Sequence, residues 1–178
     1  MRDVVLYSLL SLDGVAEEPS DWMSEVDEDV LTNLSEVIRS QDDILLGRGT
    51  YDYWAGYWPT SDVQPFADFV NGTPKHVFTS SATTVPWSQS TTVADRPAPY
   101  VEALKSRSGG DIGVHGSIRL AQSLLADGLV DRLELVVMPA LAGSGRRLFP
   151  DGLDLRQLTL TKATRSATGC VFLGYRRP

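Results

Sequence analysis

Residues 42–59 read DDILLGRGTYDYWAGYWP, and the change of pattern inside this stretch decides the predicted fold. The aliphatic run at 43–47 is typical of a short strand that is buried on both faces. The run ends in the turn Gly-Arg-Gly-Thr, and an aromatic segment with three tyrosines and two tryptophans follows it. The stretch therefore predicts a strand, a turn and a helix. The turn is a candidate to hold a charged group, and the aromatic rings are candidates to hold a flat one.

The same alternation of strand and helix extends in both directions along the chain. Aliphatic and β-branched runs predict strands at 4–10, 75–80, 111–116 and 130–139, a weak strand near 91–93, and two long strands within 153–177. Helical spacing predicts helices over 26–38, 99–105 and 118–127, with Ser24 and Ser117 as N-caps. The order predicts an α/β fold with a mixed, mainly parallel sheet, antiparallel C-terminal strands and helices on both faces.

Composition and charge limit the kinds of function. A chain of 178 residues with 42% apolar residues predicts one domain over 1–178. The formal net charge of −7 argues against nucleic acid or an anionic membrane as a partner. The single Cys170 and the two histidines offer no disulfide framework and no cluster for a metal site. The N-terminal apolar run is too short to span a bilayer and lacks a signal-peptide pattern, so a cytoplasmic protein is expected.

Three turns that follow predicted strands share one design. Each turn offers backbone N–H groups together with glycine or hydroxyl residues, which suits a phosphate oxygen. The turns are Gly47-Arg48-Gly49-Thr50, Thr79-Ser80-Ser81 and Gly116-Ser117. For a single turn, a plain N-cap at Ser117 or a surface ion pair of Arg48 is the favoured explanation. Three such turns in one domain indicate an extended ligand with several phosphates, although the sequence has neither a G-x-G-x-x-G fingerprint nor a P-loop.

The residues show no constellation typical of a hydrolase. The two histidines, His76 and His115, lie in predicted strands, and neither is next to a serine in a known motif. A lone histidine in a strand is usually structural. The SLDG segment at 11–14 is typical of a simple turn. The residues alone therefore leave the chemistry open.

Four segments, in this order, resemble the dihydrofolate reductase-like family. They are VVLYSLLSLDG (4–14), DDILLGRGTYDYWAGYWP (42–59), KHVFTSSAT (75–83) and DIGVHGSIRLAQSLLADGLVDRLELVVMPALAGSGRRLF (111–149). The chain is more similar to the branch that contains the C-terminal reductase domain of the riboflavin biosynthesis protein RibD. The most specific part is GS-x-x-L-x-x-x-LL-x-x-GLVD followed by P-x-L-x-G-x-G-x-x-LF. The resemblance covers nearly the whole chain and implies a dihydrofolate reductase-like three-layer fold.

The resemblance implies that NADPH binds across the three turns. The implied cofactor contacts are Gly47, Arg48, Gly49 and Thr50 at the phosphates, Thr79, Ser80 and Ser81 beside the adenosine, Gly116, Ser117, Ile118, Arg119 and Leu120 at the pyrophosphate, and Gly14 and Trp22 beside the nicotinamide. Within this set, Arg48 is implied to meet the 2′-phosphate. The family also implies a homodimer, formed through the sheet edge and the last strands, that acts on a small molecule.

The resemblance leaves the substrate open. Val15 stands where the riboflavin-pathway reductases carry a basic residue, and His115 stands where they carry a glutamate that touches the ribosyl substrate. Folate reductases use a buried carboxylate on the helix after the first loop, and the matching position is close to Leu31, with Asp27 and Asp29 nearby. The expected substrate is a pterin, a ribosylaminopyrimidine such as 5-amino-6-(5-phosphoribosylamino)uracil, or a related heterocyclic or carbonyl compound.

Three residues are the candidate catalytic groups at the substrate end, namely Asp13, Asp27 and His115. Of these, His115 and Asp27 are the better candidates for a proton donor. The departures at Val15 and His115 also fit an alternative of another class, a non-catalytic nucleotide-binding regulatory module that retains the NADPH cleft. A third alternative is a flavin bound by the aromatic cluster.

Overall fold

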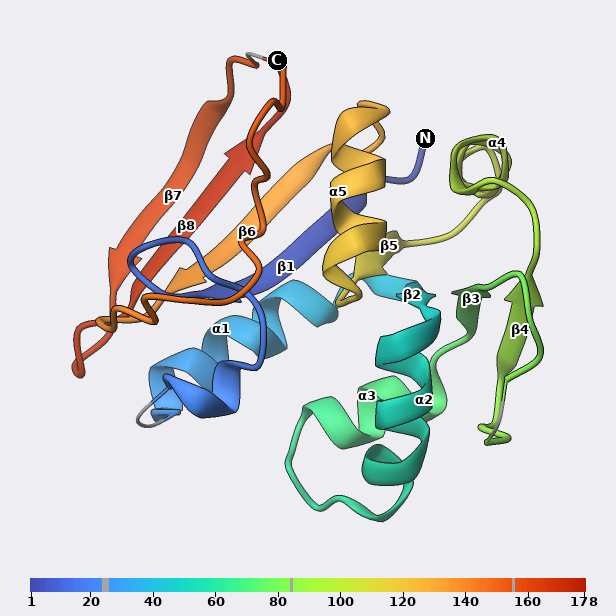
Figure 1. Cartoon of the computed structure of the whole chain (residues 1–178), viewed down its shortest axis with the longest axis horizontal. Coiled ribbons are helices and arrows are strands. Elements are labelled where there is room, and N and C mark those ends of the chain that lie inside the picture. The colour runs from blue at the N-terminus through green and yellow to red at the C-terminus, as the bar shows by residue number, and fades with distance from the viewer. Residues whose placement is uncertain (24–25, 84, 155) are drawn as a thin grey trace.

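The computed structural model describes residues 1–23, 26–83, 85–154 and 156–178. An eight-stranded sheet runs through the molecule in the order β4-β3-β2-β5-β1-β6-β8-β7 (Figure 1). The strands are β1 Val4–Leu10, β2 Gln41–Gly47, β3 Lys75–Phe78, β4 Ser90–Val93, β5 Asp111–Val114, β6 Arg132–Val137, β7 Thr159–Arg165 and β8 Val171–Arg176. The helices are α1 Glu28–Ile38, α2 Arg48–Tyr57, α3 Phe66–Gly72, α4 Pro97–Lys105 and α5 Ile118–Ala126, with 3-10 turns η1 Pro19–Asp21 and η2 Trp58–Thr60.

Parallel pairing dominates the sheet. The strands from β4 to β6 in the sheet order are parallel neighbours, and Leu45 of β2 pairs with Val114 of β5. β8 pairs antiparallel with both β6 and β7. These pairings confirm the mixed, mainly parallel sheet with antiparallel C-terminal strands. Because parallel strands end at the same edge, the turns after β2, β3 and β5 leave the sheet on the same side.

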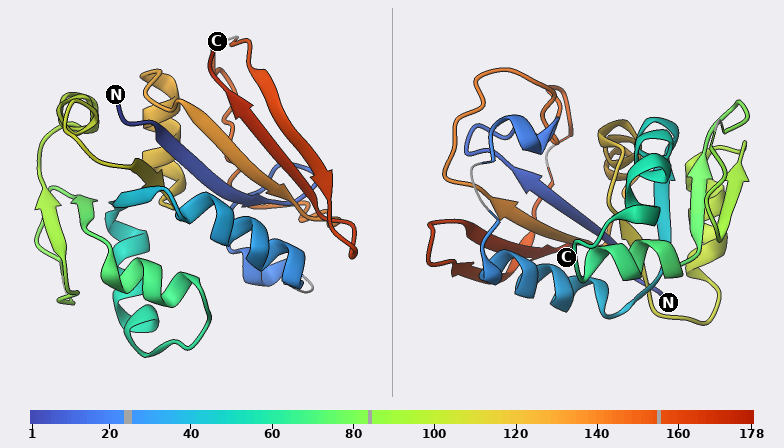
Figure 2. Two further views of the ribbon diagram at one scale, coloured as in Figure 1. Left: turned by 180° about the vertical axis from the view of Figure 1, so that it is seen from behind. Right: turned by 90° about the horizontal axis from the view of Figure 1, so that it is seen from below.

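Helices cover both faces of the sheet, as predicted. On one face, α4 and α5 pack on the central strands through buried residues such as Val101 and Leu124. On the other face, α1 packs on β1 and β6, while α2 and α3 pack on β2 and β3. Figure 2 shows this arrangement from two further sides. The middle of the sheet is thus buried on both faces, which explains the continuous apolar run of β1. None of the helices in the described ranges is long and apolar enough to cross a membrane.

Two helix starts differ from the sequence-based prediction. α1 begins at Glu28 behind Asp27, whose side chain caps the helix, whereas the predicted N-cap Ser24 lies outside the described residues. α4 begins at Pro97, two residues before the predicted start, because proline suits the first turn of a helix. Prediction from spacing alone places helix ends only within a few residues.

Three strands, β3, β5 and β6, end earlier than predicted, and one helix was not predicted. β5 ends at Val114 and β3 ends at Phe78, so His115 and residues 79–81 follow their strands and do not lie in them. The helix α3 was missed because it has 7 residues and leads into Asn-Gly-Thr-Pro (71–74), which is typical of a turn. The early ends of β3 and β5 place His115 and residues 79–81 at the carboxyl edge of the sheet.

The aromatic segment forms α2 and η2, and most of its rings are used in packing. Tyr51 is buried and donates its hydroxyl to a backbone carbonyl at 2.9 Å. Trp54 and Trp58 pack edge-on against Phe66 of α3, with ring centres 5.4 and 4.9 Å apart. Tyr53, by contrast, is 70% exposed. The rings therefore attach α2 to α3, the helix that the sequence analysis missed.

A buried lysine holds the end of α3. Lys75 at the start of β3 is fully buried, and its Nζ donates to the carbonyl oxygens of Val70 at 2.7 Å and Thr73 at 2.8 Å. The same Nζ lies 4.6 Å from the ring centre of Trp87. A cation at the C-terminal end of a helix is stabilised by the helix dipole. Burial nevertheless lowers the pKa of Lys75 to about 8.

We expect the free energy of unfolding of the wild type to rise relative to that of Lys75→Met between pH 8 and pH 10.5. The pKa of Lys75 in the folded protein, about 8, lies below its ordinary value of 10.5, so in this window the unfolded chain binds more protons. Stability therefore rises with pH, by about 2–3 kcal/mol over the window. Urea unfolding of both proteins across this range measures the effect. Parallel pH profiles for the two proteins would show that the pKa of Lys75 is not lowered.

Candidate functional site

The turns after β2 and β5 touch each other. Gly47 N donates to Gly116 O at 3.2 Å. A Cβ on Gly47 would overlap the hydroxyl of Ser117 and lie 2.9 Å from its Cβ, and a Cβ on Gly116 would lie 2.8 Å from Thr50 Oγ1. Gly116 has a φ of +147°, and its peptide bond to Ser117 is cis. The two glycines thus allow the predicted turns at 47–50 and 116–117 to form one surface.

Arg48 connects this surface to the third turn. Its guanidinium donates to Ser81 Oγ in the loop after β3 and forms an ion pair with Asp52 in α2. Within the loop, Thr79 Oγ1 accepts from Ser81 N at 3.1 Å and donates to Ser81 O at 2.7 Å, while Ser80 is exposed. The structure therefore brings the three predicted turns together at one edge of the sheet. The ion pair that sequence reasoning favoured for Arg48 is present as well.

Two helices begin at this edge. α2 has Gly47 as its N-cap, which offers no side chain to accept from the first-turn N–H groups. At the start of α5, the hydroxyl of Ser117 accepts from Leu120 N at 3.4 Å. Leu120 is buried, Ile118 is half-buried and Arg119 is exposed. Both helices present the positive ends of their dipoles here, which favours the binding of an anion.

Asp13 anchors the loop after β1. Its carboxylate accepts hydrogen bonds from Ser11 Oγ at 2.7 Å, Gly143 N at 2.9 Å and Ala142 N at 3.0 Å. These bonds, with that of Ser11 as the largest cause, lower the pKa of Asp13 to about 2. The group is ionised at neutral pH and connects two loops. It therefore holds no proton for transfer to a substrate.

Gly14 and Trp22 complete the same loop. Gly14 has a φ of +84°, and its carbonyl accepts from Leu148 N at 3.2 Å. Trp22 is half-buried, donates its indole N–H to Glu17 O at 2.8 Å, and packs against the core between α1 and the sheet. The loop after β1 thus contacts the segment at 140–148 through both its backbone and its side chains.

Asp27 is the N-cap of α1, and it is not the buried acid that folate reductases carry on this helix. Its carboxylate accepts from Val30 N at 2.9 Å and from Thr168 Oγ1 at 2.6 Å. These hydrogen bonds hold the pKa of Asp27 below its ordinary value, and the bond from Thr168 is the largest cause. The buried residues of α1 are Val30, Asn33, Val37 and Ile38. No residue on this buried face is a carboxylate, so α1 does not supply the acid that the folate reductase comparison placed near Leu31.

His115 follows β5 and lies among aromatic side chains. The ring centres of Phe66 and Phe69 from α3 are 5.3 and 5.7 Å from the imidazole, and that of Tyr7 from β1 is 5.9 Å away. His115 Nε2 lies 2.7 Å from Gln41 Oε1. Burial lowers the pKa of His115 to about 3, so the ring is neutral at neutral pH. A neutral imidazole can donate or accept a hydrogen bond here, but it cannot act as a cationic acid.

Sequence reasoning missed the residues that surround His115. A signal for α3 was present, because Phe66, Phe69 and Val70 have the i, i+3, i+4 spacing of a helix face. Gln41 carried no signal, since a polar residue at the start of a strand is common. Only the pairing of β2 with β5 places Gln41 beside His115.

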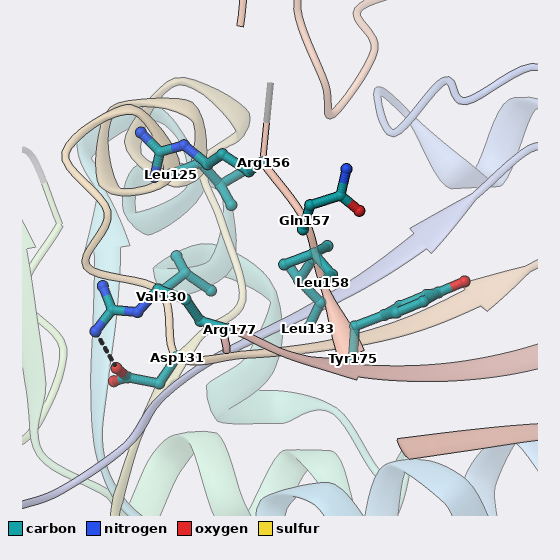
Figure 3. A pocket seen from close by; sticks show the side chains of 9 residues that line it. All are labelled: Leu125, Val130, Asp131, Leu133, Arg156, Gln157, Leu158, Tyr175 and Arg177. Atoms are coloured by element: carbon teal, nitrogen blue, oxygen red, sulfur yellow. Dashed lines mark hydrogen bonds and ion pairs between the residues drawn. The ribbon is translucent and has the colours of Figure 1, made fainter. Parts of the chain in front are cut away.

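A cavity of about 360 Å³ lies away from these turns, on the α5 face of the sheet. Figure 3 shows it between α5, β6, β8 and the segment that precedes β7. The residues that line it are Leu125, Val130, Asp131, Leu133, Arg156, Gln157, Leu158, Tyr175 and Arg177. None of the predicted site residues is among them, so this cavity is separate from the candidate site.

We expect Gly47→Ala to destabilise the protein by about 1–3 kcal/mol, because the new methyl group overlaps Ser117 and forces the two turns apart. Gly49→Ala is the matched control. The Cβ at Gly49 meets open space at the start of α2, so this change should leave stability unchanged or raise it by about 0.5–1 kcal/mol. Thermal unfolding of the two variants measures the difference. Equal stability of both variants would show that the turns do not touch at Gly47.

Solved structures share this fold. A protein of Shewanella sp. PV-4 that is provisionally named for riboflavin biosynthesis has a TM-score of 0.80 at 19% identity, with 99% of each chain covered. A pyrimidine reductase-like protein of Corynebacterium diphtheriae has a TM-score of 0.68 at 17% identity, with 99% of this chain and 92% of the other covered. Identities this low show similarity of fold alone.

A longer protein shares the fold over part of its length. The diaminohydroxyphosphoribosylaminopyrimidine deaminase/5-amino-6-(5-phosphoribosylamino)uracil reductase of Thermotoga maritima has a TM-score of 0.71 at 15% identity, and the match covers 99% of this chain and 57% of that protein.

Relatives by sequence match the chain from end to end. Two uncharacterised proteins of Bacillus subtilis (strain 168), YwjB and YyaP, are 28% and 26% identical over 99% and 98% of this chain, and the matches cover 98% and 94% of their own lengths. The model of the RibD C-terminal domain family matches residues 2–172. The chain therefore belongs to the RibD C-terminal domain family.

Proposed function

We propose that this protein is an NADPH-dependent reductase that acts on a pterin, a ribosylaminopyrimidine or a related heterocyclic or carbonyl substrate. Membership of the RibD C-terminal domain family and the reductase named in the Thermotoga maritima neighbour support an oxidoreductase of the riboflavin-pathway kind. One observation carries the proposal. The three turns predicted to bind phosphates meet at the carboxyl edge of β2, β3 and β5, where two helices begin.

The residues at this edge fit an extended, negatively charged dinucleotide. The first turn of α2 has no side-chain cap, so its N–H groups are suited to phosphate oxygens. The hydroxyls of Ser80 and Ser81 and the exposed guanidinium of Arg119 add donors on either side. Arg48 is only partly exposed and is fixed by Asp52, so its planar group is already oriented between two turns.

These residues have separate tasks in the proposed complex. Arg48 and Ser81 bind the 2′-phosphate end, which makes the site selective for NADPH over NADH. Gly116 and Ser117 bring the start of α5 close to the pyrophosphate, because Gly116 has no side chain between the two turns. The bound cofactor supplies a hydride to the substrate.

The substrate end is formed by apolar and neutral groups. Phe66, Phe69 and Tyr7 pack around the imidazole of His115. Asp13 and Asp27 are ionised and engaged in structural hydrogen bonds, and His115 is neutral. In our proposal these groups therefore orient the substrate and shape the site, and the proton comes from water.

A specific observation favours the alternative of a non-catalytic, nucleotide-binding regulatory module. At neutral pH, Asp13 and Asp27 hold no proton, and the neutral imidazole of His115 is not a cationic acid. A module of this kind would retain the phosphate-binding turns and bind NADPH without turnover. Consumption of NADPH in the presence of 5-amino-6-(5-phosphoribosylamino)uracil or dihydrofolate supports the reductase, whereas tight binding without consumption supports the module.

We expect Arg48→Gln to weaken NADPH binding about 10- to 100-fold and to affect NADH binding much less. The reason is the loss of charge-assisted hydrogen bonds to the 2′-phosphate, which NADH lacks. Fluorescence titration with both cofactors measures the two dissociation constants.

The control for this experiment is Arg39→Gln, which changes an exposed arginine at the end of α1. This variant should bind NADPH like the wild type. An equal loss of NADPH and NADH binding in Arg48→Gln would contradict the role of Arg48 at the 2′-phosphate. A wild type that does not bind NADPH would overturn both the reductase and the module.

We also propose that the protein forms a homodimer through β7 and β8. β7 is the last strand of the sheet, and nearly all of its residues are exposed. Leu158, Leu160 and Val171 are exposed apolar side chains at this end, and Leu158 and Tyr175 line the cavity of Figure 3. An exposed strand edge with apolar side chains is a favourable surface for a second chain.

If β7 and β8 form the homodimer interface, a charge on β7 should halve the mass of the protein in solution. Leu160→Lys introduces a charge on β7 and should convert the dimer to a monomer at micromolar concentration, as measured by size-exclusion chromatography with light scattering. Val63→Lys is the control, because Val63 is a similarly exposed apolar residue far from β7 in the sequence and outside the last strands. A monomeric wild type would exclude this interface.

A further inference from the structure

The hydrogen bond between Gln41 and His115 determines which imidazole nitrogen carries the proton. Gln41 is 6% exposed at the start of β2, and its Oε1 lies 2.7 Å from His115 Nε2. An amide oxygen only accepts hydrogen bonds, so Nε2 must be the donor. Burial disfavours the charged form of His115 and lowers its pKa, so the ring is neutral at neutral pH, and a neutral imidazole carries one proton. His115 is therefore the Nε2–H tautomer, and its Nδ1 is left with a lone pair.

A glycine in β5 makes this pair possible. A Cβ on Gly113 would overlap Gln41 Oε1 and would lie 2.7 Å from Gln41 Cδ and 2.9 Å from His115 Nε2. Glycine inside a strand often marks a close approach of another group. Here the missing side chain leaves room on the face of the sheet for the amide of Gln41, which could not otherwise reach the imidazole.

The surroundings of the pair are uncharged. Burial is the cause of the low pKa of His115, and the rings nearest to the imidazole are Phe66, Phe69 and Tyr7. The two acidic residues that follow Gln41 do not change this, because Asp42 pairs with Arg2, and Asp43 pairs with Arg2 and His76. A site with neutral walls recognises an uncharged part of a ligand, because a buried charge without a partner is costly.

The pair also offers a second polar atom. Among the described residues, the buried Nε2 of Gln41 has no hydrogen-bond partner. The amide Nε2 can donate, and the imidazole Nδ1 can accept. The pair therefore combines a neutral donor with a neutral acceptor.

We propose that Gln41 is a positioning residue for the proposed reductase site. It holds His115 as the Nε2–H tautomer, so that Nδ1 accepts a hydrogen bond from an N–H or O–H group on an uncharged part of the substrate. Only one part of this proposal rests on the proposed function, namely that the group which donates to Nδ1 of His115 belongs to the substrate. The tautomer itself is a property of the protein without any ligand.

The tautomer is tested by NMR on the full-length ¹⁵N-labelled protein. The chain has two histidines, so a spectrum of His76→Gln assigns the signals of His115. At neutral pH, Nε2 of His115 should be protonated and Nδ1 should not. Gln41→Met, which is similar in size but lacks the acceptor, should give a mixture of tautomers. Gln41→Glu keeps an acceptor oxygen, so Nε2 should again be protonated, and its carboxylate, when ionised, also favours a second proton on Nδ1. A protonated Nδ1 in the wild type, or no change in Gln41→Met, would overturn the proposal.

The functional consequence is measured with 5-amino-6-(5-phosphoribosylamino)uracil as the probe. Gln41→Met should raise its KM about tenfold, the cost of one misplaced hydrogen bond, and leave NADPH binding unchanged. Gln157→Met, at an exposed glutamine in the separate cavity, should leave both values as in the wild type. A wild type that does not reduce the probe counts against the proposed function, whereas the NMR result decides the role of Gln41 separately. An unchanged KM in Gln41→Met would contradict that role.

Discussion

The contact between the turns after β2 and β5 is the constraint on which the candidate site depends. Gly47 and Gly116 approach so closely that a single methyl group on either would collide with the opposite turn. Because β2 and β5 are parallel neighbours, their carboxyl ends lie together, and the two helices that follow begin at one place. In the proposed complex, the two helix dipoles and the uncapped first turn of α2 allow an acidic protein to hold an anion at this place.

The opposite end of the site has a different electrostatic character. Around His115 the walls are aromatic rings and one amide, and burial keeps the imidazole neutral. The buried face of α1 adds no carboxylate. One end of the proposed site therefore favours charge and the other end disfavours it. A ligand with phosphates at one end and a neutral ring at the other fits both.

Asp13 and Asp27, two of the candidate catalytic residues, make structural hydrogen bonds in the fold. Asp13 connects two loops through backbone N–H groups, and Asp27 caps a helix. In both cases hydrogen bonds to the carboxylate stabilise its charged form and lower its pKa. A short acidic side chain after a strand or before a helix has this structural task in many proteins, and sequence alone does not separate it from an acid in a site.

The sequence by itself determined the alternation of strands and helices, the mixed sheet and the three phosphate-type turns, because each depends on local periodicity and on glycine or hydroxyl residues at strand ends. It did not determine α3, whose helical spacing covers only 7 residues and is followed by a turn-like sequence, or the contact of Gln41 with His115. That contact joins residues 74 positions apart and exists only because β2 pairs with β5 across a strand position that has no side chain, Gly113. Only the tertiary structure decides contacts of this kind, since they arise from the register of the sheet and not from any local pattern.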